Sequence, residues 1–130
     1  MNPTFLNLDD ILMIHSNQVE LFGGDPSIRD LDLLKSAIAQ PSAGFGEEYF
    51  HKDIYEMAAA YLFHICKNHP FVDGNKRTAG ASATTFLKVN QIEFIVDEDT
   101  FAQFVIDVAC SRLEKPEIAE FFRNHSNQPE

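Results

Sequence analysis

The sequence is short of positive charge, of cysteine and of long apolar runs, and each shortage excludes a class of protein. Only 10 Lys and Arg stand against 20 Asp and Glu, which gives a formal net charge of −10 and a pI of about 4.8. The cations are scattered, whereas a nucleic-acid-binding surface usually shows a basic stripe, so we expect no nucleic-acid partner. A basic protein partner or substrate suits this charge better.

The two cysteines, Cys66 and Cys110, are too few for a disulfide framework. Each lies in an apolar helical pattern, so we expect two buried free thiols, which suit a reducing cytoplasm. No apolar run approaches the roughly 20 residues of a membrane-spanning helix, so we expect no membrane partner. Residues 1–4 do not open a basic region followed by an apolar stretch, and no signal peptide is expected. Together these features predict a cytoplasmic location.

The chain is rich in helical periodicity. With 130 residues and 45% hydrophobic residues, it is long and apolar enough for one domain over residues 1–130. Apolar residues recur at helical spacing over residues 8–21, 31–40, 52–68, 77–90 and 100–112, with a last short helix after Pro116. The sequence therefore predicts an all-α fold, a compact bundle of about six helices. Residues 90–96 read as a short extended segment, and from Asn124 we expect a frayed tail.

Residues 69–80, which read HPFVDGNKRTAG, form the most informative run. Pro70 biases His69 toward extended geometry, so the preceding helix should end near Asn68. Asn75 is a favoured N-cap, so the next helix should start there, with free backbone amides at its first turn. The run therefore predicts a loop that joins two central helices.

Lys76 and Arg77 fall in the first turn of that second helix, where the backbone already carries partial positive charge. Two cations fit there if an anion binds beside the free amides, as in a phosphate site. Asp73 could hold Mg²⁺, and His69 is the group in the run that can take a proton near neutral pH. These residue types together predict transfer of a nucleotide-derived group to a hydroxyl. The alternative is an ordinary helix–turn–helix joint with solvated charges.

The same run resembles the signature of the Fic/Doc superfamily, His-x-Phe-x-(Asp/Glu)-(Gly/Ala)-Asn-(Gly/Lys)-Arg. The matching positions are His69, Phe71, Asp73, Gly74, Asn75, Lys76 and Arg77. The Doc, or death-on-curing, branch is the more similar one. Lys76 stands where the AMP-transferring branch has glycine, and Gly80 stands where that branch has a further arginine.

The resemblance implies roles for these residues. His69 would be the catalytic base and Asp73 the ligand of Mg²⁺. The phosphates of ATP would bind to Gly74, Asn75, Lys76 and Arg77. The implied protein is a Doc-type toxin kinase that moves the γ-phosphate of ATP to a Ser or Thr hydroxyl of a target protein, with elongation factor Tu as the implied target and a small antitoxin as a partner. Two alternatives stay open: Fic-type AMP transfer to a protein hydroxyl, and a non-catalytic binding protein on the same scaffold.

Three further segments carry expectations. Residues 41–50 have no clear period and read as a loop, either packed on the surface or a mobile cover; the resemblance favours a flap along which target peptides dock. His15 lies on or beside the apolar face of the first helix, so a hydrogen-bonded core histidine is expected. Arg29 reads equally as a structural ion-pair partner or a ligand. Ser16 to Glu20 comes close to the inhibitory pattern of Fic proteins, but Leu21 breaks it, so inhibition would come from another chain.

Overall fold

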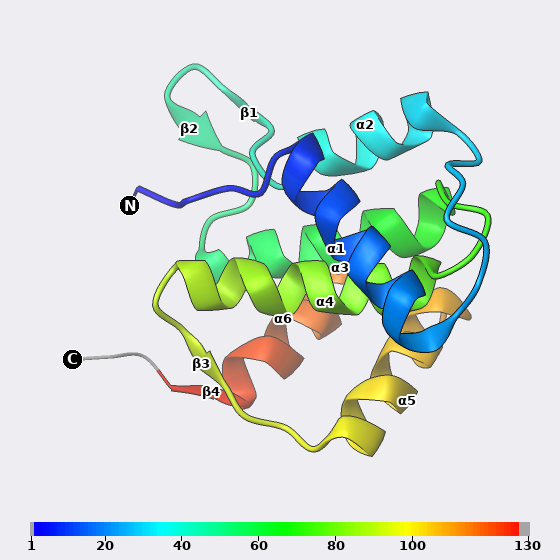
Figure 1. The fold of residues 1–130 in the computed structure, drawn as a ribbon. Coiled ribbons are helices and arrows are strands. Elements are labelled where there is room, and N and C mark those ends of the chain that lie inside the picture. The colour runs from blue at the N-terminus through cyan, green and yellow to red at the C-terminus, as the bar shows by residue number, and fades with distance from the viewer. Residues whose placement is uncertain (1, 128–130) are drawn as a thin grey trace.

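The protein is built mainly of helices in the computed structural model, which describes residues 2–127 (Figure 1). Within these residues the chain forms six helices and four strands of two residues each, so the all-α prediction is confirmed. In chain order the elements are α1 (Leu8–Phe22), α2 (Leu31–Ala39), β1 (Gly44–Phe45), β2 (Glu48–Tyr49), α3 (Ile54–Asn68), α4 (Asn75–Val89), β3 (Glu93–Phe94), α5 (Glu98–Ala109), α6 (Lys115–Asn124) and β4 (Ser126–Asn127). None of the described helices is long and apolar enough to cross a membrane.

Helix α3 lies at the centre of the bundle and packs against α2, α4, α5 and α6. Its helical run of apolar residues explains this position, because residues 57–62 are all fully buried. The carboxylate of Asp53 caps the N-terminus of α3 and accepts a hydrogen bond from the Glu56 amide at 2.8 Å. The predicted central helix is therefore confirmed, and it fixes where the loop after Asn68 begins.

Helix α4 returns alongside α3 and is approached closely by its neighbours (Figure 1). Its small residues make this possible. A Cβ on Gly80 would lie 3.2 Å from the Phe101 ring and 3.4 Å from a methyl of Val105, both on α5. These distances are tighter than ordinary contact, so the glycine lets α5 pack directly on the backbone of α4.

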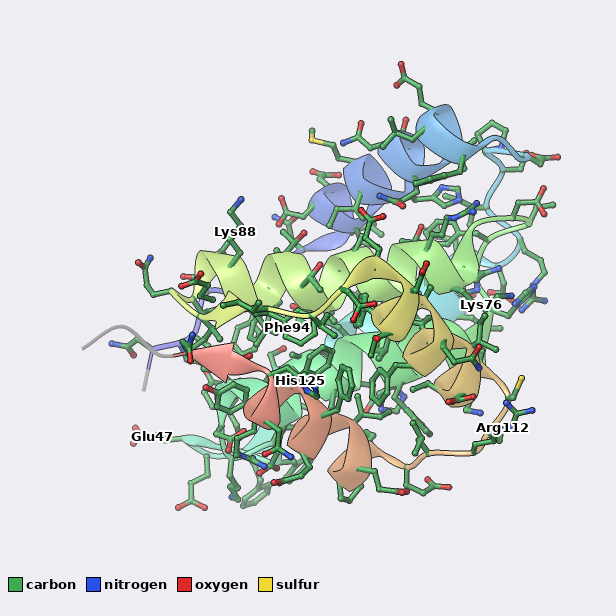
Figure 2. All side chains as sticks on the ribbon, turned by 90° about the horizontal axis from the view of Figure 1, so that it is seen from below. Glu47, Lys76, Lys88, Phe94, Arg112 and His125 are labelled. Atoms are coloured by element: carbon green, nitrogen blue, oxygen red, sulfur yellow. The ribbon has the colours of Figure 1, made fainter. Side chains whose placement is uncertain are left out.

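Residues 41–50 form a β-hairpin rather than an irregular loop. Strands β1 and β2 pair antiparallel through a turn at Gly46, whose φ of 63° suits glycine, and Tyr49 packs its ring on Phe5. Figure 2 shows Glu47 of this hairpin and Lys76 of the motif at opposite ends of the molecule. The 15 residues of α3, about 22 Å at 1.5 Å per residue, separate the two ends. The hairpin was expected to act as a flap over the site, but in this structure it does not cover the motif loop.

The tail does not fray directly after Asn124. Residues 126–127 form β4, which pairs antiparallel with β3 in the extended segment that the sequence predicted. Phe94 of β3 also packs on α6, with its ring centroid 5.3 Å from that of Phe122. The pairing and the aromatic contact hold the chain end on the bundle up to Asn127, and the rest of the predicted tail lies outside the described residues.

The two cysteines differ in exposure, so the prediction of two buried thiols is half wrong. Cys66 is buried in α3, and this burial raises the pKa of its thiol to about 11. Cys110 is exposed, because it is the C-cap of α5 and follows the last turn that faces the core.

Candidate functional site

His69 ends α3 in a left-handed conformation, with φ 48° and ψ 54°. The helix stops at Asn68 as predicted, but the prediction that His69 adopts extended geometry before Pro70 is wrong. The physical reason is a contact from far along the chain. Arg29 donates from Nε to the carbonyl oxygen of His69 at 2.6 Å and from Nη2 to that of Asn68 at 2.9 Å. Arg29 forms no ion pair within residues 2–127, and its guanidinium caps the end of α3.

Asn75 is not the N-cap of α4, contrary to the prediction. Gly74 takes that place with a φ of 82°, and Asn75 is the first helical residue, with only 5% of its surface exposed. Its side chain turns back into the loop, accepting from the Phe71 amide and donating to the Phe71 carbonyl, both at 2.9 Å. Its Nδ2 also lies 3.3 Å from Nε2 of His69. With the amide as donor, Nε2 is the unprotonated nitrogen, which is the form that a base requires.

Helix α1 supports the other side of the loop through His15. This histidine is buried, its ring stacks on Phe71 with centroids 3.7 Å apart, and its Nε2 lies 2.8 Å from the carbonyl oxygen of Asp73. Because a carbonyl only accepts, the imidazole donates here. The expected hydrogen-bonded core histidine is confirmed, and its partner is the motif itself. The carboxylate of Asp73 in turn accepts from the Asp25 amide at 2.8 Å.

The start of α4 opens into a cavity of about 640 Å³ between α1, α4 and α5. The predicted phosphate-binding residues all line it, and aromatic rings from α1 and α5 complete its walls. Its lining includes Gly74, Asn75, Lys76, Arg77, Phe22 and Phe101. His69 is exposed beside this cavity and is not part of its wall; Asn75 connects the two. Phe22 and Phe101 were missed by the sequence reasoning, since both lie in helices that pattern alone assigns to packing.

The first turn of α4 is electropositive. The amides of residues 75–77 have no hydrogen-bond partner within residues 2–127, and no side chain caps them. Neither Lys76 nor Arg77 forms an ion pair in the described part of the chain. Arg77 instead lies 4.1 Å over the Phe22 ring, a cation–π contact. What distinguishes these two cations is their place: they add positive charge to a helix start whose amides are already free, and this arrangement favours an anion from outside the chain.

The residues around Asp73 fit one type of metal site. No group of three or more His, Cys, Asp and Glu that could hold a metal ion occurs among the described residues. A metal held by protein side chains alone is therefore not supported there. Mg²⁺ commonly takes one or two carboxylates together with substrate phosphates and water. The exposed carboxylate of Asp73, next to the first turn of α4, fits that arrangement.

Comparison with known proteins connects this geometry to a family. The model described as the Fic/DOC family matches residues 5–87, a range that includes the whole motif, helices α1 to α3 and most of α4. This chain belongs to the Fic/DOC family. It is 40% identical over 96 residues to "Toxin Doc" of Mycolicibacterium smegmatis, covering 73% of this chain and 71% of that protein. It is 27% identical over 115 residues to "Protein kinase doc" of Escherichia phage P1, covering 88% of this chain and 90% of that protein.

Both relatives carry the name Doc, so this Fic/DOC protein belongs to the Doc branch, as its motif predicted. The family match ends at residue 87, within α4. Helix α5, which forms one wall of the cavity, therefore lies outside the matched range. The motif and helix α1, which supports it, lie within the matched range, whereas Phe101 lies beyond its end.

Proposed function

We propose that this protein is a Doc-type toxin kinase, a single domain that transfers the γ-phosphate of ATP to a Ser or Thr hydroxyl of a target protein. One observation carries the proposal. Lys76 and Arg77, which form no ion pair, line a cavity at the first turn of α4, where the backbone amides are also free, and His69 lies directly beside this cavity. The names of the two relatives, one a toxin and one a protein kinase, support it.

In the proposed reaction the hydroxyl oxygen of the target attacks the γ-phosphorus. The bond from that phosphorus to the oxygen bridging the β- and γ-phosphates breaks as the new bond forms, and ADP leaves with the bridging oxygen. Nε2 of His69 accepts the hydroxyl proton. Lys76, Arg77 and the amides of residues 75–77 stabilise the charge on the phosphate oxygens. Mg²⁺ held by Asp73 would add positive charge beside those oxygens.

The packing of α4 favours phosphoryl transfer over AMP transfer. The AMP-transferring pattern places a second arginine where this chain has Gly80. Here a Cβ at that position would already meet Phe101 at 3.2 Å, so α5 would have to move to admit a long side chain. Lys76 likewise puts a bulky cation where that pattern has a bare backbone. Both differences support the kinase, with AMP transfer as the alternative.

The two activities are separated by where the label sits on ATP. Purified protein is incubated with Mg²⁺, a bacterial lysate and ATP labelled on either its γ- or its α-phosphate. We expect a protein, proposed to be elongation factor Tu, to take up only the γ-label. His69→Ala should abolish this transfer, whereas His125→Ala, at the C-cap of α6 and outside the lining of the cavity, should keep it. Uptake of α-label would establish AMP transfer instead, and undiminished transfer by His69→Ala would remove the assigned base.

Expression in bacteria tests the toxin part of the proposal. The wild-type chain should arrest growth, and His69→Ala should relieve the arrest. Co-expression of a small antitoxin protein should also relieve it, since no inhibitory motif is complete within this chain. Harmless expression of the wild type, with no label transferred from either form of ATP, would favour a non-catalytic binding protein. A target in translation would also place the protein in the cytoplasm.

A further inference from the structure

The backbone of His69 is unfavourable on local grounds. Its φ of 48° is a left-handed value, which side chains with a Cβ rarely adopt, although histidine does so more often than most. The proline that follows adds a second penalty, because it pushes the preceding residue toward extended geometry. Such a conformation persists only where surrounding contacts over-determine it. The contacts that do so here come mainly from the segment between α1 and α2.

Arg29 supplies the side-chain contacts. Its guanidinium bridges the carbonyls of Asn68 and His69 with bonds of 2.9 and 2.6 Å, so both carbonyls are held in one orientation. Its charge also lies at the C-terminus of α3, where the helix dipole favours a cation. The backbone amides of Arg29 and Asp30 separately donate to the Pro70 carbonyl at 2.7 and 3.0 Å. The peptide on either side of His69 is thus bound by the same segment.

We infer that Arg29 is a positioning residue for the proposed base: it holds His69 left-handed so that Nε2 lies against Asn75 at the cavity edge. This inference rests on the proposed kinase function. Arg29 does not touch the cavity, and it acts only through the backbone of His69. Without the guanidinium the preference imposed by Pro70 draws His69 toward extended geometry, which turns the imidazole away from Asn75.

A purely structural cap predicts something different. Capping α3 would affect stability and leave the reaction of the folded protein unchanged. The variant Arg29→Met tests this directly, because it removes the guanidinium but keeps an unbranched side chain. The backbone bonds from residues 29 and 30 to Pro70 remain possible, and Arg29 is exposed, so the variant should fold.

The experiment measures steady-state phosphoryl transfer at several ATP concentrations. We expect Arg29→Met to lower kcat by about 10- to 100-fold, as misplacement of a reacting group does, with KM for ATP within about twofold because the phosphate cradle is untouched. Arg29→Lys should fall between, since a lysine cannot bridge two carbonyls in a fork. For Arg29→Ala, added ethylguanidinium should restore part of the rate. Lys88→Met, which removes one exposed charge at the opposite end of α4, should match the wild type (Figure 2).

NMR gives a readout that does not depend on activity. The Cα and Cβ shifts of His69 and its HN–Hα coupling should indicate a positive φ in the wild type and move toward extended values in Arg29→Met. A wild-type kcat in Arg29→Met, while His69→Ala is inactive, would overturn the positioning role and leave the kinase proposal standing. If no variant or wild type transfers phosphate, the kinase proposal fails, and unchanged His69 shifts in Arg29→Met would then also overturn the positioning role.

Discussion

Asn75→Ala tests whether one buried amide holds the motif loop together. The side chain satisfies both the N–H and the C=O of Phe71, a residue that is itself fully buried. A buried polar group left without a partner costs about 1–3 kcal/mol. Two such groups give about 2–6 kcal/mol, and water entering the vacated space should offset part of this. We therefore expect the free energy of unfolding to fall by about 2–4 kcal/mol.

Thermal unfolding followed by circular dichroism measures this loss. For a chain of this size, a change of 1 kcal/mol moves Tm by roughly 3–5 °C, so Asn75→Ala should lower Tm by about 10 °C. The matched control is Asn17→Ala on the exposed surface of α1, where a substitution should stay within about 0.5 kcal/mol. Equal Tm values for the two variants would refute the reasoning, because the loop would then be held by contacts other than the Asn75 side chain.

Two further predictions concern titration and thiol chemistry. Burial, and then the charge of Lys115 with its Nζ 3.1 Å from Nε2, lowers the pKa of His64 from 6.5 to about 4. As the pH falls, His64 therefore takes up a proton in the unfolded chain before it does so in the folded one. Its contribution to the free energy of unfolding is fully present above pH 6.5 and should be lost as the pH falls toward 4. We expect a loss of about 1–2 kcal/mol, because His64 is partly exposed. Urea unfolding at pH 7.5 and pH 5 checks this, and His64→Gln should flatten the difference. A thiol reagent should label exposed Cys110 in the native protein and buried Cys66 only after unfolding, as mass spectrometry of the two peptides would show; equal labelling would contradict the packing of α3.

The sequence predicted those parts of the fold that local rules determine. Helical spacing located α3, and the capping of helices by a preceding aspartate, as at Asp30 and Asp53, follows a local preference of that residue type. The run of small residues in α4 is also a local feature, and it permits the close packing that Gly80 provides against α5. These features share one property: the interaction that decides them lies within a few residues or follows from one repeated face.

The sequence failed where a contact between distant segments outweighs the local preference. The rule for residues before proline is correct on average, but Arg29, 40 residues away in sequence, reverses it at His69. The N-cap preference of asparagine is also real, but Phe71 offers Asn75 two buried backbone groups instead of one exposed amide. No pattern in a single sequence indicates which distant group will compete for a polar side chain.

Both departures from local preference, at His69 and at Asn75, lie in the motif loop. Residues 69–75 take their shape from His15 on α1, from Arg29 after the turn that follows α1, and from Asn75 on α4, rather than from their own conformational preferences. The loop is therefore only as well positioned as α1 is against α4. A substitution that loosens α1 should impair the proposed phosphoryl transfer before it unfolds the bundle, whereas one in the distant β1–β2 hairpin should leave the geometry of the loop unchanged.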